Sequence, residues 1–210
     1  MLKPIARYSF NNQTHQVSEA TEKIHELIKN ASYSNDDIVL KRNEIKEAFF
    51  SPFKPQLKNA QVFLSHSHAD KNEALKLKNY LESKTNHKVF ADSLFWDYKD
   101  DVLNKLAKYD DNISRIKDAF TLILRESLEY MIKKCPYFVF LQSKNSVSNQ
   151  GLSQITYSAW IYEELKIAHS ISESRPIPMM ESMQVFHDIS PFLESFETIT
   201  LKKLSQQINS

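Results

Sequence analysis

The chain has 210 residues, of which 41% are hydrophobic and 25% are charged, and its formal net charge is +1. That length fits one domain of ordinary size with an extension, or two small domains. The near-zero charge, with Lys and Arg spread along the chain, gives no long-range field for nucleic acid or for an anionic membrane, so we expect neither as a partner.

Three further features of the composition limit the class of protein. The single cysteine, Cys135, excludes an internal disulfide and is typical of a reducing compartment. Residues 1–16 lack the apolar core of a signal peptide, and no segment approaches the about 18 apolar residues that cross a bilayer. We therefore expect a soluble, cytoplasmic protein. The single glycine, Gly151, excludes Gly-rich phosphate loops, so a bound nucleotide would depend on side chains and helix N-termini.

Residues 1–58 are predicted to form a helical extension. Apolar residues recur at helical spacing and predict a first helix that ends near Asn30. The polar cluster at residues 34–37 is expected to begin a second helix that runs to Phe49. Two prolines shortly after it end the helical pattern and indicate a linker at residues 51–59.

Residues 59–210 change to a pattern in which strands and helices alternate. Short apolar segments predict strands at residues 61–65, 88–91 and 136–141. Amphipathic segments predict helices at residues 70–81, 112–133 and 158–169, the first with Asp70 and Glu73 as a capping box. A long polar segment separates the second strand from the helix at 112, Pro176–Met180 is a candidate further strand, and residues 193–208 are weakly patterned.

This alternation predicts an α/β fold with an open parallel sheet and helices on both faces. The fully apolar 136–141 segment is typical of a strand at the centre of such a sheet. Ligands of these sheets bind beyond the carboxyl ends of the strands. The rule indicates the loops that begin at Ser65, Asp92 and Gln142.

One glutamate falls on the apolar side of the helix predicted after Ser158. With Trp160 set at zero and about 100° per residue, Glu164 lies at about 40°, inside the apolar stripe, and Glu163 at about 300°, outside it. Because an ionised carboxylate is costly to bury, such a residue is either functional or held by a structural ion pair or backbone bond. Glu164 is therefore a candidate for a functional site, and Glu163 for a surface charge.

Four segments resemble the motifs of TIR (Toll/interleukin-1 receptor) domains, in the family's order. Residues 62–70 (VFLSHSHAD) are similar to its opening strand, and residues 89–92 (VFAD) to its second strand, which leads into the BB loop. Residues 138–143 (FVFLQS) resemble a later central strand. Residues 158–165 (SAWIYEEL) match S-x-W-x-x-x-E-L, whose glutamate is the one of the NAD-cleaving members, and this selects Glu164 over Glu163.

The resemblance implies a flavodoxin-like fold, self-association between TIR domains, and cleavage of NAD+ at the nicotinamide–ribose bond with no cofactor. Residues 89–101 also resemble bacterial TIR proteins of the Thoeris anti-phage type, which make a cyclic or derivatised ADP-ribose signal for an effector partner. Three departures stand out. The BB loop lacks the usual Pro or Gly, the stretch before the helix at Asn112 is unusually long, and the loop after Ser143 is longer than typical.

If the resemblance holds, Glu164 is the catalytic residue. Nicotinamide leaves the cationic pyridinium as a neutral molecule and needs no general acid, so one carboxylate that stabilises an oxocarbenium-like ribosyl centre can suffice. Trp160, one turn earlier, would wall the substrate pocket or anchor the helix in the core.

The other candidate substrate-binding residues lie at the expected strand ends. Ser65 and His66 would contact the ribose or a phosphate, and Asp92 would orient the BB loop. Trp96 would cover the pocket or pack against the protein, and Ser143 is a candidate polar contact.

Two alternative interpretations remain open at this level. A non-enzymatic TIR scaffold would bind other TIR domains. A metal-dependent hydrolase would use His66, His68 and Asp70, whose H-x-H-x-D spacing occurs in metallo-β-lactamases. Against it, Lys71 stands where that motif usually has a further histidine. A Cys135 nucleophile has little support, because the residue lies beside the start of an apolar strand.

Overall fold

The computed structural model describes residues 10–30, 32–34, 37–39, 41–51, 58–109, 113–150, 153–172 and 187–209. The chain packs as two compact units, Met1–Pro55 with Leu94–Arg125, and Gln56–Ser93 with Glu126–Ser210. The boundary predicted at residue 58 lies close to the first of these divisions. It did not anticipate that residues 94–125 pack with the N-terminal segment.

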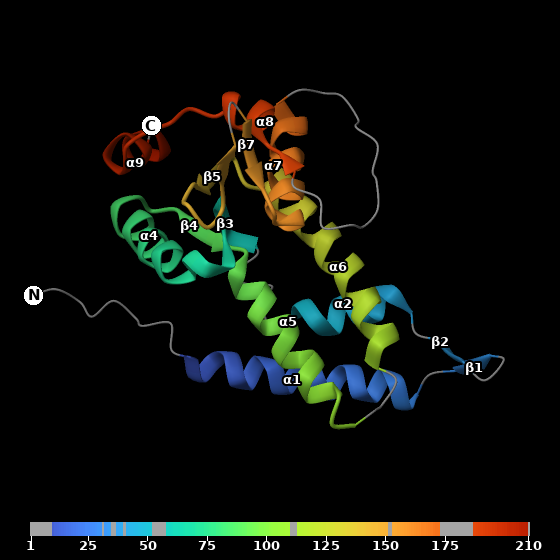
Figure 1. Cartoon of the computed structure of the whole chain (residues 1–210). Helices are drawn as coiled ribbons and strands as arrows, with labels where there is room; N and C mark the ends of the chain where they lie inside the picture. Colours follow the sequence, from blue (N-terminus) through green and yellow to red (C-terminus); the bar gives the residue numbers. More distant parts are fainter. Residues whose placement is uncertain are drawn as a thin grey trace, which may run out of the picture. The chain divides into compact units, whose positions relative to one another are not determined.

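The first unit is mainly helical. Its elements are α1 (Phe10–Lys29), β1 (Ser32–Ser34), β2 (Asp37–Val39), α2 (Arg42–Phe50), most of α5 (Ser93–Leu106) and the first half of α6 (Ile113–Lys134). Within it, α1 contacts α2 (Figure 1). Lys105 of α5 donates to Ser18 of α1 at 2.7 Å. The buried residues of α1 lie on the predicted stripe, and its end at Lys29 agrees with the prediction.

Two predictions for this unit were wrong. The helix predicted to begin in the polar cluster begins later, because Ser34 and Asp37 belong to the antiparallel strands β1 and β2 and α2 begins only at Arg42. Ser and Asp are found in several local structures besides helix N-caps, so these residue types alone did not fix where the helix starts. The polar segment after Asp92 is the helix α5, whose buried Tyr98 and Val102 form an apolar face among acidic neighbours.

An aromatic cluster forms the core of the first unit. Phe49 has no exposed surface, and its ring centroid lies 4.8 to 4.9 Å from those of Phe50, Tyr98 and Phe120. The Tyr98 hydroxyl donates to the Phe49 carbonyl at 3.0 Å. This cluster therefore joins α2, α5 and α6.

The second unit is mixed α/β. Its elements are β3 (Ala60–His66), the 3-10 turn η2 (His68–Asp70), α4 (Lys71–Lys84), β4 (Lys88–Ala91), the end of α6, β5 (Tyr137–Leu141), β6 (Ser148–Gln150), β7 (Ser153–Thr156), α7 (Ala159–Ser172), β8 (His187–Asp188), α8 (Ser190–Glu194) and α9 (Leu201–Asn209). The predicted strands and the helices α4, α6 and α7 are confirmed. None of the helices among these described residues has the length and hydropathy needed to cross a lipid bilayer.

Three parallel strands form the main sheet in the order β4-β3-β5. The strand in the middle is thus β3, not the 136–141 segment as predicted. Every residue of β5 is half-exposed, whereas all but one of β3 are buried. The apolar run in β5 therefore does not reflect a central position in the sheet. Its residues are apolar because alternate side chains pack against helices on the two faces of the sheet.

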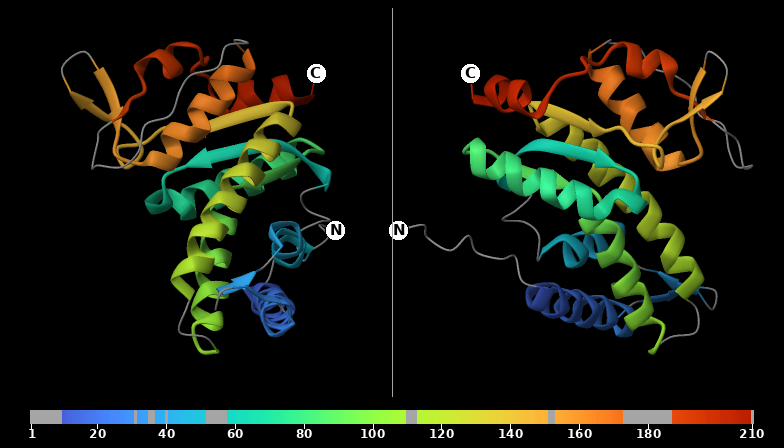
Figure 2. Two further views of the ribbon diagram at one scale, coloured as in Figure 1. Left: turned by 90° about the vertical axis from the view of Figure 1, so that its right-hand side faces the viewer. Right: turned by 60° about the vertical axis from the view of Figure 1, so that its left-hand side comes forward.

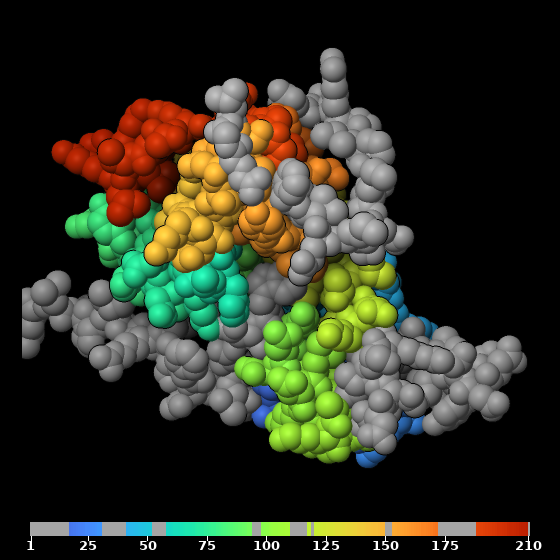
Figure 3. Space-filling view, viewed as in Figure 1, coloured from blue at the N-terminus to red at the C-terminus, as the bar shows by residue number. Residues whose placement is uncertain are grey.

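Helices cover both faces of this sheet (Figure 2). On one face, Val62 and Leu64 pack with Leu77 and Leu81 of α4. Helix α9 extends this layer, since Ile208 joins the same cluster, and the two helices lie together at the surface (Figure 3). On the other face, side chains of α7 and α8 pack against Phe138 and Phe140 of β5.

A second sheet of three short antiparallel strands, β6-β7-β8, was not predicted. Its strands β6 and β7 lie in the loop after Ser143 that is long for the TIR pattern, and β7 leads directly into α7, whereas β8 follows α7. The weakly patterned residues 193–208 contain the end of α8 and most of α9. The strand predicted at Pro176–Met180 lies outside the described residues.

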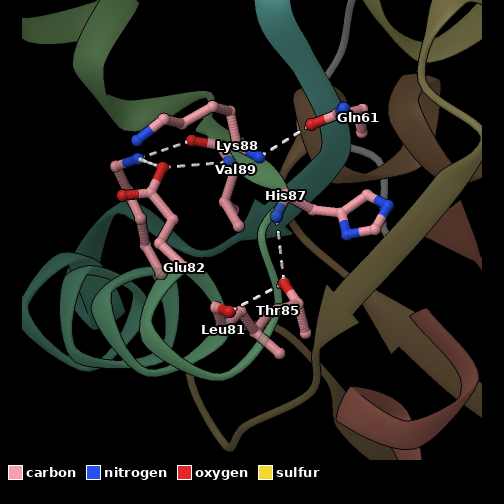
Figure 4. A network of polar contacts seen from close by, with 8 residues as sticks. Gln61, Leu81, Glu82, Thr85, His87, Lys88 and Val89 are labelled. Atoms are coloured by element: carbon pink, nitrogen blue, oxygen red, sulfur yellow. Dashed lines mark hydrogen bonds and ion pairs between the residues drawn. The ribbon is translucent and has the colours of Figure 1, made fainter. Parts of the chain in front are cut away.

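Side chains of α4 form hydrogen bonds with backbone groups of β4 (Figure 4). Glu82 Oε1 accepts the Val89 amide at 3.0 Å and the Lys78 ammonium at 2.6 Å. Lys78 also donates to the Val89 carbonyl at 2.6 Å. Because β4 lies at the end of the strand order, these contacts take the place of a neighbouring strand.

We predict that Glu82→Ala lowers the free energy of unfolding by about 1–3 kcal/mol. The change leaves the Val89 amide without its acceptor and Lys78 without its carboxylate partner. Urea titration followed by circular dichroism measures the effect. Glu129→Ala is the matched control, because it removes an exposed i,i+4 pair with Lys133 and should cost less than about 0.5 kcal/mol. Equal effects would show that the contact with β4 contributes nothing.

Candidate functional site

Helix α7 places Glu164 inside the second unit. Ser158 precedes the helix and its hydroxyl accepts the Ile161 amide at 3.3 Å. Ile161, Glu164 and Leu165 are 2%, 0% and 0% exposed, so Glu164 lies on the buried face as predicted. The neighbouring Glu163 side chain is 22% exposed and lies 3.9 Å from Lys166. Glu163 is thus less exposed than predicted, but it faces away from the core.

Glu164 meets the end of the central strand. Phe63 and Ser65 share a face of β3 because side chains alternate along a strand, and Phe63 stacks on Phe138, which packs against α7. The Ser65 hydroxyl donates to Glu164 Oε2 at 2.5 Å, and neither residue has any exposed surface. This hydrogen bond brings together two residues that are 99 positions apart in the sequence.

His66 and Asp92 form a second buried pair at the ends of β3 and β4. His66 Nδ1 lies 2.8 Å from Asp92 Oδ1, at 0% and 6% side-chain exposure. The two atoms are close, but their geometry is not that of a hydrogen bond. Asp92 Oδ1 also accepts the Ser93 amide at 2.8 Å. β3 and β4 pair in parallel up to Leu64 and Ala91, and β3 continues beside β5 to His66, so His66 and Asp92 lie at the same end of the sheet.

Unpartnered polar atoms concentrate in these residues. Across the described part of the chain, five buried side-chain N or O atoms lack a hydrogen-bond partner, and four of them belong to His66, Ser93 and Glu164. They are both ring nitrogens of His66, the Ser93 hydroxyl and Glu164 Oε1. Buried polar atoms are normally paired, and exceptions occur where a site awaits a ligand or a proton.

The environment of Glu164 favours its protonated form. Complete burial raises the pKa of this carboxyl well above its ordinary value of 4.5, and the nearby charge of Asp92 raises it further. The hydrogen bond from Ser65 acts in the opposite direction and is outweighed. Perturbed carboxyl groups of this kind are typical of acid–base and electrostatic sites.

Ser143 and Asp70 lie in a separate network. The Asp70 carboxylate accepts the Ser143 hydroxyl and, at 2.6 Å, the Asn145 amide. The predicted capping box is therefore wrong in its side-chain bond, because Asp70 precedes α4 without capping it. Ser143 helps to fix the loop after β5, and nothing brings it to Glu164.

The two tryptophans are placed less closely. Trp160 is half-buried in the first turn of α7, one turn before Glu164, as predicted from their spacing. Trp96 belongs to α5, and its side chain lies outside the described residues. The structure thus brings Ser65, His66 and Asp92 together with Glu164, and leaves the two tryptophan roles as predictions.

The structure separates the three candidate ligands of the metal-hydrolase alternative. His66 approaches Asp92, Asp70 accepts bonds from the loop after β5, and His68 is exposed. In the part of the chain that the structure describes, no three His, Cys, Asp or Glu residues form a group able to hold a metal ion. The three histidine and aspartate side chains of the motif therefore have separate surroundings.

Cys135 is predicted to react slowly in the folded protein. Its thiol is buried, its Sγ lies 3.7 Å from the Ala60 carbonyl, and burial raises its pKa to about 11 despite the opposing charge of Lys134. The thiolate is the reactive form, so at pH 8 modification by a disulfide reagent should be about 100-fold slower than in urea. Equal rates in the two conditions would contradict the burial of this thiol.

Ser93 is the residue of this cluster that sequence reasoning missed. It follows Asp92, is 1% exposed and begins α5. Its position directly after a strand and before a helix is a usable signal, but α5 had been taken for a polar segment. Recognising that helix would have placed a hydroxyl and a helix N-terminus beside Asp92.

No family model, curated protein or solved structure matches this chain. The site is therefore interpreted from its geometry and from the four sequence motifs alone.

Proposed function

We propose that the chain is a TIR-like NAD+ nucleosidase or cyclase in which Glu164 acts at the nicotinamide-bearing ribose. The observation that carries the proposal is the fully buried Glu164 carboxyl, bonded to Ser65 at the carboxyl end of a parallel strand. That edge is where ligands bind in open α/β sheets. Glycosyl transfer from a cationic leaving group needs one such carboxylate.

The strand order supports a flavodoxin-like sheet as part of this proposal. Taken from the start of the second unit, β3, β4 and β5 are its first, second and third strands, so their order is 2-1-3. Flavodoxin-like sheets begin in the same way, and their ligands bind where the strand order reverses, between strands one and three. Ser65 and His66 are the last two residues of the first of those strands. The helices of residues 1–58 would then be an extension to this domain.

The chemistry assigned to Glu164 is electrostatic. As the bond between ribose and nicotinamide breaks, its electron pair leaves with nicotinamide, which becomes neutral, and positive charge develops on the ribose. An ionised Glu164 would stabilise that charge, and a water molecule or another nucleophile would complete the reaction. Cyclic or conjugated ADP-ribose would result where the second nucleophile belongs to the substrate or to another molecule.

The site is closed in this structure, since Glu164 and Ser65 have no exposed surface. We propose that NAD+ enters after self-association through the TIR-like domain or another trigger opens it. The nucleotide product would then act as a signal on an effector partner, in anti-phage defence of the Thoeris kind. The complete burial of Glu164 also favours a second candidate function, a non-enzymatic TIR scaffold for homotypic signalling.

One assay separates the two candidates. The purified full-length protein is incubated with NAD+ over a range of protein concentrations, nicotinamide is followed by chromatography, and the nucleotide product is identified by mass. The enzyme should release nicotinamide at a rate that rises faster than linearly with its concentration. No release at any concentration, with NAD+ recovered intact, would contradict the enzymatic proposal and leave the scaffold.

A further inference from the structure

We propose that Asp92 is a positioning residue for Glu164, and that with His66 it holds Glu164 as a neutral acid in the closed site until the cationic substrate enters and Glu164 loses its proton to water. This inference rests on the proposed function and assigns Asp92 a role different from the orientation of the BB loop expected from the sequence. Asp92 would act through Glu164 rather than on NAD+.

The unpartnered oxygen of Glu164 is the first observation behind this inference. Oε2 accepts the Ser65 hydroxyl, whereas Oε1 is buried without a partner among the described residues. The neighbouring group is the Asp92 carboxylate, and two ionised carboxylates can only accept hydrogen bonds. A proton on Oε1 turns the same approach into a donor–acceptor pair. Protonation is thus the change that satisfies this atom without moving any residue.

Asp92 itself is held in a fixed position. Its Oδ1 lies 2.8 Å from His66 Nδ1 and accepts the Ser93 amide at 2.8 Å. Both contacts are made by Oδ1, and the same side chain acts on Glu164 through its charge and a side-chain hydrogen bond. The side chains of His66, Asp92 and Glu164 are all buried, so solvent screens the interactions between them only weakly.

Among the described elements that contact α7, none adds a further buried acidic side chain. Strand β3 contributes Ser65 and His66, and β7 (Ser153–Thr156) has no ionisable side chain. Helix α8 has one such residue, Glu194, and it is exposed. On α7 itself, Glu163 and Lys166 lie beside each other. Burial and the charge of Asp92 are the two largest causes that raise the pKa of Glu164.

Proton linkage gives a test that needs no enzymatic activity. Above about pH 4.5 the unfolded chain loses the Glu164 proton while the folded state keeps it, so folded wild-type protein loses stability as pH rises. Glu164→Gln cannot titrate, and its amide mimics the neutral acid. We expect the unfolding constant of the wild type relative to this variant to rise up to tenfold per pH unit until the folded Glu164 ionises.

The variant Asp92→Asn isolates the proposed role. Without the charge of Asp92, Glu164 should ionise at lower pH. The ratio of unfolding constants should therefore stop rising at a lower pH than in the wild type. For Asp92→Asn, the matching ratio compares its unfolding constant with that of the double variant Asp92→Asn/Glu164→Gln. At pH 8 this ratio should be at least about tenfold smaller than the ratio of the wild type to Glu164→Gln. Ser65→Ala should do the opposite and extend the rise to higher pH, because it removes the bond that favours the ionised form. Ratios that are equal within twofold for the Asp92 and wild-type pairs would overturn the inference.

Asp92→Asn and Ser65→Ala should move the pH at which the ratio stops rising in opposite directions. A general loss of structure would not produce opposite shifts, so this pair of variants distinguishes it from a positioning role. If Asp92→Asn does not fold, the ratio of the wild type to Glu164→Gln decides whether Glu164 is held neutral, and a ratio that does not rise above about pH 4.5 would overturn the inference. In the NAD+ assay, the rise of the rate with pH should move to lower pH in Asp92→Asn. If the wild type releases no nicotinamide, the proposed enzymatic function fails, while the unfolding ratios still test the protonation of Glu164.

Discussion

Replacing Glu164 with glutamine should lower the rate of nicotinamide release by about 1,000-fold while the protein stays folded. The ionised carboxylate is the one group proposed to stabilise the developing positive charge, and removal of such a group typically has an effect of this size. Glutamine has nearly the same volume and can still accept the Ser65 hydroxyl. The rate is measured by chromatography of nicotinamide at a saturating concentration of NAD+.

Glu163→Gln is the control for this substitution. Glu163 is adjacent, carries the same charge and lies 3.9 Å from Lys166 at a partly exposed position. Its loss should change the rate by less than about threefold, because weakly paired, partly exposed charges contribute little. Equal losses of activity in both variants would indicate a damaged helix, and unimpaired activity of Glu164→Gln would remove Glu164 from the mechanism.

Phe49→Ala should lower the free energy of unfolding of the first unit by about 3–5 kcal/mol. The ring has no exposed surface and packs on Phe50, Tyr98 and Phe120, so its removal loses buried apolar area and leaves a cavity that its aromatic neighbours cannot readily fill. Urea unfolding followed by circular dichroism measures the effect, because the first unit is mainly helical.

The comparison for Phe49→Ala is Leu122→Ala. Leu122 lies on α6 of the same unit but is 56% exposed, so its truncation should change stability by less than about 0.5 kcal/mol. A small effect of Phe49→Ala would show that residues 94–125 do not depend on the N-terminal helices for their packing.

The parts of the fold that could be predicted are those with a clear period. The strands 61–65 and 88–91 and the helix at 112–133 combine strong apolar patterning with little polar interruption, and each lies within a few residues of its prediction. Helix α7 was predicted well because Ser158 marks its start. Glu164 could be selected for a physical reason, since its place on the apolar stripe requires burial whatever the family.

The parts that could not be predicted depend on partners distant in the sequence. Helix α5 carries acidic residues at positions 97, 100 and 101, which hide the apolar face that meets Phe49. The pairing of β6 with β7 involves short polar strands whose period is too brief to recognise. Asp70 has the spacing of a helix cap, but its carboxylate accepts from Ser143 and Asn145, which no local pattern reveals.

The site shows the same division. The ends of β3 and β4 indicated Ser65, His66 and Asp92 from the general rule for parallel sheets. The sequence did not show that Asp92 approaches His66, or that Ser65 bonds Glu164, because these contacts depend on the register of three elements. Ser143 follows a strand too, yet its bond to Asp70 directs it to the neighbouring loop.

A single-turnover experiment tests the central claim most directly. Protein in excess over NAD+ is incubated at the concentration that gives the highest activity, and nicotinamide is quantified per NAD+ supplied. The wild type and Glu163→Gln should each release one equivalent, and Glu164→Gln should release none on the same time scale. Release by Glu164→Gln at the wild-type rate, or none by the wild type, would contradict the assignment of Glu164 as the residue that cleaves NAD+.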